Sequence, residues 1–521
     1  MPKFPSALKL AVSALLLSAL LAFPHTALAQ EGGGGHHDHG GHEASPLAGP
    51  LSWGFLTFGA VVIAAVSLIL FTGGRPKSVT ASDFEKLTGV GGYLAKMRLF
   101  SRNARLFMVH VVGMDVIYGT WMVVFNLYLL AVGFDVAFVG LRILLASIAS
   151  AVASVPAGLI SDRIGRKLSF ILGDGIGAAT SLIAISTQDP TLLLVTAVVG
   201  GAFGALHGVA EPAFMAENSE NYERVHLFSV SDGTRTAAAI IGSALAGLAS
   251  LMFTGVDAAA KVGLYQTVAY VGIGGWFASL IPAILLQQTA AHAPRLTPHA
   301  SLTTRLFGNV KHPERIWQLT APEVIIGLGA GFTLPLLNVF FKQNLGSPEV
   351  EIGATFAAGQ AFLVVGSFLA PLLAARLGKV KSIALTRLAS IPFILLIAFS
   401  SDVGSAFGSV LTVAGLAYIA RITLMNMAGP VRSAFGMEIL DPAERGTQVG
   451  IQLAVSSALS GAASYFGARL MDAGDFRTPF FIMAGCYLLA TALFWQFFAG
   501  RERQLAPVGV AAEAEAAAMG D

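Results

Sequence analysis

Long apolar runs, separated by short polar loops, follow one another along most of this chain. Between residues 106 and 499 they lie at 106–130, 138–160, 168–187, 190–215, 228–253, 264–287, 318–341, 351–375, 382–400, 405–430, 447–471 and 478–499. Each run has about the 17–25 residues that a helix needs to cross a bilayer. Backbone groups in lipid must be bonded within helices or closed barrels, and the roughly ten-residue alternation typical of barrel strands is missing. The pattern therefore predicts an all-α integral membrane protein with twelve spans in this region.

The composition agrees with a membrane protein. Of the 521 residues, 55% are hydrophobic and 12% charged, and the mean hydropathy is +0.71, whereas a soluble domain carries about a quarter charged residues. A net charge of +2, with no basic run among aromatics, gives no reason to expect a nucleic-acid partner. The single cysteine, Cys486, excludes an internal disulfide and a cysteine-based metal site. The chain has no nucleophile–base pair, nucleotide loop or catalytic metal motif, so we do not expect an enzyme.

The N-terminal hundred residues contain signals of export. Residues 1–29 have a basic start, an apolar core and a small-x-small end at Ala27 and Ala29, which predicts a cleaved secretory signal peptide. An uncleaved first helix is the alternative. Residues 30–50 are rich in Gly and His, and residues 51–72 are long enough to form an extra transmembrane helix.

Basic residues predict the orientation of the chain in the membrane. The linker 73–104 contains six Lys and Arg residues, and Arg105 follows directly after it. The positive-inside rule therefore places this linker in the cytoplasm. Alternate loops downstream are basic, while loops such as 131–137, 188–190 and 401–404 hold no Lys or Arg. We therefore expect a bacterial cytoplasmic (inner) membrane protein with the segment 30–50 outside and the C-terminus inside.

One loop occurs twice, 213 residues apart. The stretch 158–167 reads GLISDRIGRK, and 371–379 reads PLLAARLGK in the same slot. Two copies of one membrane unit in the same orientation indicate a duplicated bundle with a cavity between its halves. The predicted halves are 105–287 and 317–500, joined by a cytoplasmic linker at 288–316, and 501–521 is expected to be a disordered cytoplasmic tail.

This loop and the six-plus-six layout closely resemble the major facilitator superfamily (MFS) of secondary transporters, over roughly residues 105–500. The resemblance implies the MFS fold, here with one extra N-terminal helix, and transport of a small solute by alternating access. It also implies that the loop is a conformational latch between the halves, with a simple topology anchor as the alternative. The latch residues are Gly158, Asp162, Arg163, Gly165, Arg166 and Lys167, with Arg376, Gly378 and Lys379 in the second copy. The second copy has Ala375 in place of the acid, and 242–247 lacks the proline of drug–proton antiporters.

Polar groups inside the spans are the substrate and proton candidates, because an ionisable side chain at bilayer depth costs several kcal/mol. They are Asp115, Asn126, Arg142, His207, Glu211, Asp232, Arg235, Asn338, Arg421 and Asn426. Glu211 is the main proton-coupling candidate, since a carboxyl group shielded from water takes up a proton more readily. His207 lies one turn before it on the same face, and Asp232 can pair with Arg235 at i and i+3.

Three further polar positions are interpreted as structural, and one pair is left open. Asp174 and Arg387 occupy equivalent repeat positions near the cytoplasmic end and are expected to be structural. His110 is expected to be a packing residue. Asn126 and Asn338 suit polar contacts to a substrate or hydrogen bonds between helices, and the sequence does not choose between the two.

The segment 30–50 contains a possible metal-binding run. Its residues His36, His37, Asp38, His39, His42 and Glu43 can coordinate Zn²⁺, Ni²⁺ or Cu²⁺. A low-complexity exported spacer is the alternative.

Two function classes follow. The first is a carrier that moves a small-molecule or ion substrate, is coupled to protons and has a relation to transition metals. We expect it to be a monomer in contact with membrane lipids and to require no cofactor. The second is a metal-handling or sensing membrane protein that acts through its external tail. The substrate, the direction and the coupling ion are not encoded in these patterns.

Overall fold

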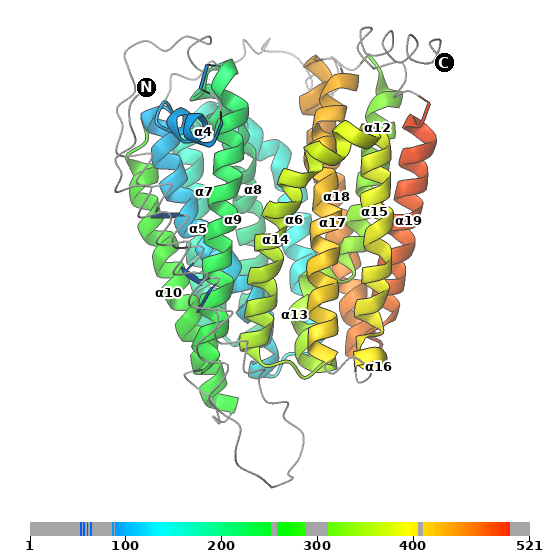
Figure 1. The fold of residues 1–521 in the computed structure, drawn as a ribbon. Helices are drawn as coiled ribbons and strands as arrows, with labels where there is room; N and C mark the ends of the chain where they lie inside the picture. The colour runs from blue at the N-terminus through cyan, green and yellow to red at the C-terminus, as the bar shows by residue number, and fades with distance from the viewer. Residues whose placement is uncertain are drawn as a thin grey trace. The chain divides into compact units, whose positions relative to one another are not determined.

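The computed structural model describes residues 53–54, 56–57, 60, 63–64, 86–87, 89–251, 258–287, 311–404, 410–440 and 442–500. Within these residues every regular element is a helix (Figure 1), which confirms the all-α prediction. The expected signal peptide, His-rich segment and C-terminal tail lie outside the described residues. The few described residues of 51–72 are helical, and a span there stays a prediction.

Six long helices cover the six apolar runs of the first half, after a short helix α4 (Gly89–Met97). They are α5 (Arg102–Val132), α6 (Val136–Ile164), α7 (Arg166–Ser186), α8 (Pro190–Glu217), α9 (Asn221–Leu251) and α10 (Ala258–Ile284). Side-chain oxygens of Ser101, Asp135 and Asp189 cap the starts of α5, α6 and α8 by accepting hydrogen bonds from backbone N–H groups. Such caps satisfy donors that the first turn leaves unpaired, so the polar loops determine where these helices begin.

The second half contains a longer series of elements. They are α12 (Pro313–Gly331), η1 (Leu334–Leu336), α13 (Leu337–Val339), η2 (Phe340–Asn344), α14 (Glu349–Leu377), α15 (Lys379–Ala398), α16 (Ser400–Val403), α17 (Val410–Ile439), α18 (Pro442–Asp472) and α19 (Thr478–Phe498). Among the described residues, 11 helical segments are long and apolar enough to cross a membrane. The run 351–375 lies in α14, which is not one of these segments, so the count of twelve spans stays a prediction.

The seventh apolar run differs from its prediction of one unbroken span over 318–341. Helix α12 ends at Gly331, and a 3₁₀ turn, a short α-helical turn and a π-helical turn follow. Pro335 cannot donate a backbone hydrogen bond to the carbonyl of Gly331, four residues earlier. Gly331 also packs directly against the backbone of Ser460, where a side chain would collide. The segment Pro313–Asn344 is still one of the 11 helical segments long and apolar enough to cross a membrane. Only the regular α-helix within the run is interrupted, after Gly331.

The described chain divides into two compact units that differ from the two halves in sequence. The first unit comprises residues 1–296, 334–361 and 464–476, and the second comprises 297–333, 362–463 and 477–521. In the first unit α5 packs against α9 and α10, and α6 and α7 pack against α8 (Figure 1). In the second unit α15 packs against α17 and α19, and α12 packs against α19. The candidate site described below lies wholly in the first unit.

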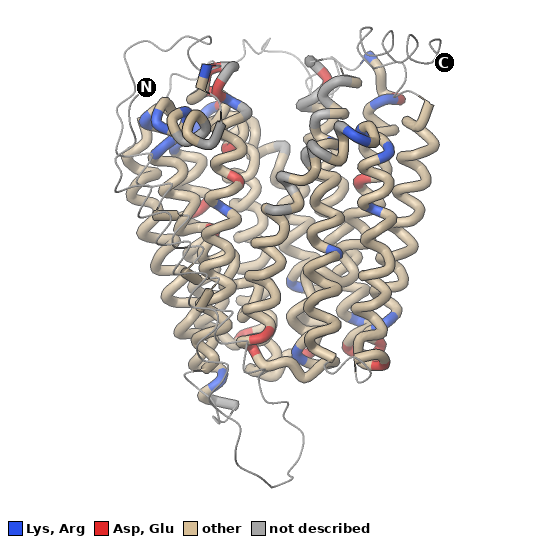
Figure 2. Tube along the Cα trace, in the orientation of Figure 1, with Lys and Arg blue, Asp and Glu red and all other residues tan. Residues whose placement is uncertain are grey.

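Small residues allow the closest helix contacts of the first unit. A side chain at Gly242 of α9 would overlap the backbone of α5 at Val116, and Gly247 lies against Gly353 of α14. Helices in membranes gain contact area in this way, because association there depends on packing rather than on the hydrophobic effect. Lys and Arg residues of this unit gather on α4 and the helix ends beside it (Figure 2). The orientation of this end in a membrane stays a prediction.

Candidate functional site

The repeated loop has the same backbone geometry in both copies. Gly165 separates α6 from α7 with φ 87° and ψ 157°, and Gly378 separates α14 from α15 with φ 85° and ψ 165°. This region of backbone space is adopted readily only by glycine. The 213-residue repeat therefore extends from the sequence to the conformation of the turn.

Charged side chains of the first loop tie three helices together. Arg166 Nη1 lies 2.8 Å from Asp162 Oδ1, and Arg166 Nε lies 3.1 Å from Glu217 Oε1 at the end of α8. Glu217 was not among the predicted latch residues. Arg163 is exposed, and no described atom lies within 4 Å of where a Cβ of Gly158 would stand. Gly158 therefore makes no close contact with another described helix, whereas Gly165 makes the tight reversal between α6 and α7.

Arg235 of α9 connects two acidic residues on other helices. Its Nε donates to Asp115 Oδ2 of α5 at 2.9 Å, and its Nη1 donates to both carboxylate oxygens of Glu211 of α8 at 2.7 Å. The i, i+3 pair expected between Asp232 and Arg235 is not formed. Asp232 is exposed, whereas the guanidinium of Arg235 contacts the carboxylates of Asp115 and Glu211.

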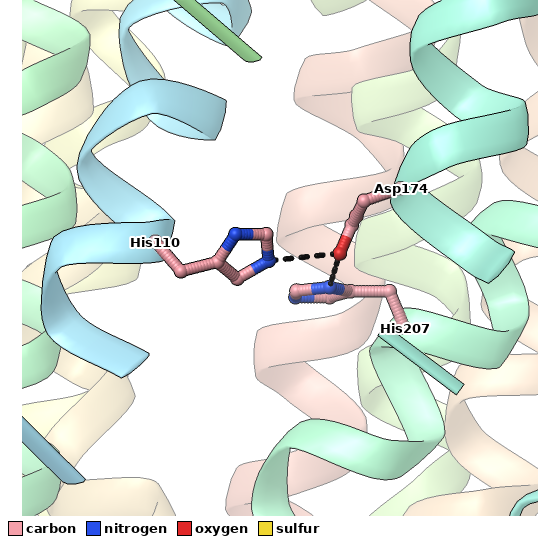
Figure 3. A group of neighbouring side chains, drawn as sticks. All are labelled: His110, Asp174 and His207. Atoms are coloured by element: carbon pink, nitrogen blue, oxygen red, sulfur yellow. Dashed lines mark hydrogen bonds and ion pairs between the residues drawn. The ribbon is translucent and has the colours of Figure 1, made fainter. Parts of the chain in front are cut away.

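The network continues into a buried cluster of two histidines and one carboxylate (Figure 3). Asp174 Oδ2 of α7 lies 2.8 Å from His207 Nδ1 of α8 and 2.9 Å from His110 Nε2 of α5. His110 Nδ1 lies 2.8 Å from the carbonyl oxygen of Ser279 and donates to it. His207 Nε2 lies 3.3 Å from Glu211 Oε2, which joins the cluster to the Arg235 group. The exposed fractions of His110, Asp174 and His207 are 0%, 2% and 6%.

The network contains six ionisable side chains, namely His110, Asp115, Asp174, His207, Glu211 and Arg235. Their positive and negative charges do not cancel when both imidazoles are neutral. The carboxylates of Asp115, Asp174 and Glu211 carry three negative charges, and the guanidinium of Arg235 carries one positive charge, which leaves a net charge of −2. His110 also has an oxygen acceptor at both ring nitrogens, whereas a neutral ring has only one N–H. Bound cations would resolve both problems at once.

Aromatic side chains line one side of the histidine cluster. The rings of Phe107 and Phe170 lie 4.9 Å apart, and the ring of Phe170 lies 5.2 Å from that of His207. Phe107 and Phe214 also pack together, with ring centroids 5.2 Å apart. Such apolar surroundings strengthen electrostatic interactions, because little water screens the charges.

A cavity of about 620 Å³ opens beside the network within the first unit. Asp115, Asp174, His207 and Arg235 contribute its polar groups, and most of the remaining lining is apolar or aromatic. His110 lies eight residues, or about 12 Å, after the start of α5 at Arg102. Asp115 lies thirteen residues, or about 20 Å, after the same point. Both residues lie well inside the 31-residue helix α5, which is long and apolar enough to cross a membrane.

The other candidates do not join this network. Asn126 Nδ2 donates to Asn338 Oδ1 at 3.0 Å, a hydrogen bond between helices, which was one of the two interpretations left open. The guanidinium of Arg142 lies 4.3 Å from the ring centroid of Phe125, and no acidic partner is found for it among the described residues. Arg421 donates to the hydroxyl group of Tyr487. Asn426 donates to the carbonyl of its own helix at Ile422.

The second half holds an ion pair at the positions equivalent to His110 and Asp174. Residues 213 further along the chain are Glu323 and Arg387, and Arg387 donates to Glu323 Oε1. The first and third helices of each half are thus joined by a contact between a basic and an acidic side chain, with the two types exchanged between the halves.

The rest of the network has no such counterpart. Three of its members correspond to Leu328, Ala420 and Leu424 in the second half. The wider network is therefore a property of the first half.

Sequence reasoning identified four members of the network, namely Asp115, His207, Glu211 and Arg235, and did not foresee that His110 and Asp174 belong to it. His110 was expected to pack and Asp174 to be structural. The one available signal was the repeat itself, since an acid and a base, Glu323 and Arg387, stand at their equivalent positions.

Comparisons with known proteins agree with this architecture. The family model of the Major Facilitator Superfamily matches residues 106–464. The chromaffin granule amine transporter of Rattus norvegicus is 24% identical over 229 residues, which cover 43% of this chain and 40% of that protein. The chain thus spans less than half the length of this curated relative.

Two of the similar solved structures are transporters. A mutant of the nucleoside transporter NupG has a TM-score of 0.60 at 16% identity, covering 75% of this chain and 99% of that one. A D-xylose–proton symporter has a TM-score of 0.59 at 15% identity, covering 76% of this chain and 97% of that one. At these identities the likeness concerns the fold.

Proposed function

Because the chain belongs to the Major Facilitator Superfamily, we propose that it is a secondary active transporter that carries a small solute by alternating access and is driven by protons. The observation that carries this proposal is the network of six ionisable groups inside the first unit. A bundle that served only as a scaffold would gain nothing from burying them, since each costs several kcal/mol at bilayer depth.

The net charge of the network is the reason to expect coupling to a cation. With neutral imidazoles it is −2, and the uncompensated charge lies where screening by water is weak. Protons from the medium neutralise it one at a time. Arg235 holds Asp115 and Glu211 together, so a proton on either carboxylate weakens one of its two contacts. The packing of α5, α8 and α9 then responds to the proton, which is what coupling to alternating access requires.

The test is proton movement in proteoliposomes that contain the purified protein and a pH-sensitive dye. Solutes are screened for those that move protons, and the active solute is then given to the variants Asp115→Asn and Glu211→Gln. Both variants are expected to lose accumulation against a gradient while retaining exchange of solute for solute, because we assign proton loading to these two carboxylates. Asp232→Asn is the matched control, since that carboxylate is exposed on the same helix as Arg235.

Two results would oppose the proposal. If Asp232→Asn impairs accumulation as strongly as the other two variants, the effect is not specific to the network. If solute accumulates without any proton flux in the parent protein, the coupling ion is not the proton.

A second candidate function is metal handling through the external His-rich segment, which the buried histidine cluster also favours. The residues concerned, His36 to Glu43, lie outside the described part of the chain. Metal content of cells tests it, measured by mass spectrometry for the parent, for a deletion of residues 36–43 and for Glu211→Gln. If the protein changes the metal content of the cells and only the deletion abolishes this change, metal handling depends on the His-rich segment alone. If only Glu211→Gln abolishes it, metal handling depends on the carrier alone.

The proposal includes a location and an orientation. We place the chain as a monomer in a bacterial cytoplasmic membrane, with its signal peptide cleaved, residues 30–50 outside and the C-terminus inside. The alternating basic loops and the basic linker 73–104 support this orientation. Reporter fusions at the C-terminus and after residue 50 test it, and an external C-terminal reporter would contradict it.

A further inference from the structure

We propose that His110, Asp174 and His207 form a binding site for a divalent transition-metal ion, which makes such an ion the solute of the carrier. This inference rests on the proposed transport function and assigns its substrate class. The three side chains come from α5, α7 and α8, and their ligand atoms all lie within 4.8 Å of one another. Among the described residues this is the one group of His, Cys and acidic side chains with that spacing.

The distances suit an ion after a small expansion. Metal–nitrogen and metal–oxygen bonds of about 2.0–2.1 Å in a tetrahedral site place neighbouring donors about 3.3 Å apart. His110 Nε2 and His207 Nδ1 now lie 2.9 and 2.8 Å from Asp174 Oδ2, so each contact must lengthen by about half an ångström. Asp174 and His207 also border the cavity, which leaves room for a water molecule as a further ligand.

The ligand types narrow the class of ion. Two imidazoles and one carboxylate suit Zn²⁺, Fe²⁺, Co²⁺ or Ni²⁺. Calcium and magnesium prefer sites made of oxygen atoms alone. The chemistry of the site therefore points to a first-row transition metal.

An oxygen atom beside the outer ring nitrogen of each imidazole favours the tautomer that binds a metal ion. The carbonyl of Ser279 accepts from Nδ1–H of His110, which leaves the lone pair of Nε2 directed at Asp174. His207 Nε2 faces Glu211 Oε2 at 3.3 Å, so a proton on that nitrogen leaves the lone pair of Nδ1 directed at the same carboxylate oxygen. Metal-bound histidines usually donate their other N–H to a carbonyl or carboxylate in this way.

The charge of the network fits one divalent ion. With neutral imidazoles the three carboxylates and Arg235 sum to −2, which a single M²⁺ cancels. The Arg235 pair also keeps Glu211 in place beside His207. The second half has no comparable site, because a guanidinium, Arg387, stands where Asp174 stands in the first half, and a guanidinium does not bind metal ions.

The first measurement is binding of Co²⁺ to the purified full-length chain. The histidines of residues 30–50 would bind Co²⁺ as well. The parent protein for this experiment is therefore a quadruple variant that combines His36→Ala, His37→Ala, His39→Ala and His42→Ala. Equilibrium dialysis gives the stoichiometry, and visible absorption of Co²⁺ reports nitrogen and oxygen ligands. We expect one Co²⁺ per chain and a loss of affinity of tenfold or more in Asp174→Asn and in His207→Gln.

Glu323→Gln is the matched control, since it breaks the equivalent ion pair of the second half and touches no proposed ligand. It should bind Co²⁺ as the parent does, and size-exclusion chromatography and thermal unfolding check that each variant is folded. If the parent binds no Co²⁺, or if folded Asp174→Asn and His207→Gln bind it as tightly as the parent, the site is refuted.

A transport assay separates failure of the site from failure of the carrier. Proteoliposomes with the parent protein are loaded with a metal-sensitive dye, and Co²⁺ or Zn²⁺ is added outside. Entry that Asp174→Asn abolishes supports the assigned substrate. Binding without entry refutes the metal as solute, and proton-driven movement of an organic solute by a protein that binds no Co²⁺ refutes the site while the carrier stands.

Discussion

The Arg235 group allows a quantitative test of the charge count. Replacing Arg235 by glutamine changes the net charge of the network from −2 to −3 and leaves Asp115 and Glu211 without the cation that they share. Breaking a buried ion pair costs about 3–5 kcal/mol. The side chain of Arg235 is 29% exposed, against 9% for Asp115 and 16% for Glu211. Water therefore screens part of the loss, and we expect Arg235→Gln to lower the free energy of unfolding by about 2 kcal/mol.

A second substitution in the same chain should restore much of that loss. Asp115→Asn combined with Arg235→Gln returns the net charge to −2, because one carboxylate and one guanidinium are removed together. We therefore expect a favourable interaction energy of about 1 kcal/mol between the two substitutions, within the range of contacting residues. Asp232→Asn combined with Arg235→Gln is the control and should restore little, since Asp232 is exposed.

The assay is unfolding in mixed micelles with increasing amounts of an anionic detergent, followed by tryptophan fluorescence. The parent, both single variants and the double variant complete the cycle. Strict additivity of the two single effects would refute the reasoning, because it would mean that Asp115 and Arg235 do not interact. A fully stable Arg235→Gln variant would refute it as well, since the charge imbalance would then cost nothing.

Three further predictions concern the fold around the site. Gly165→Ala should lower the free energy of unfolding by about 1–3 kcal/mol, because its backbone conformation excludes side chains, whereas Gly158→Ala should have little effect in the same unfolding assay. Gly242→Leu should abolish the folded monomer peak in size-exclusion chromatography, because a side chain there overlaps the backbone of α5. Asn126→Ala removes a hydrogen bond to Asn338 and should lower stability by about 1 kcal/mol; if transport instead falls with stability unchanged, the pair contacts substrate.

The break in the seventh apolar run shows how far local reasoning reaches. The break follows Gly331, and Pro335, four residues later, is visible in the sequence. Length and hydropathy alone do not detect it, because a run of apolar residues has the same hydropathy whether or not its backbone hydrogen bonds continue. A proline by itself does not predict it either, because α8, α10 and α15 continue through Pro212, Pro282 and Pro392.

The network shows where such reasoning ends. His110, Asp174 and His207 stand far apart in the chain and form no motif, and each by itself has an ordinary structural explanation. The pairing of Arg235 was misjudged for the same reason, because Asp232 is close in sequence while Asp115 and Glu211 are close in space.

The sequence by itself determined what depends on neighbouring residues. The apolar runs, the caps and the turn glycines Gly165 and Gly378 each act within about one helical turn, and so the helices and the repeat could be predicted. Only the tertiary structure decided which charged groups meet, because that depends on the rotation and depth of four separate helices. A change of one residue in helix phase turns a side chain by about 100°, enough to move a ligand from the cavity to the lipid, and no local pattern records that angle.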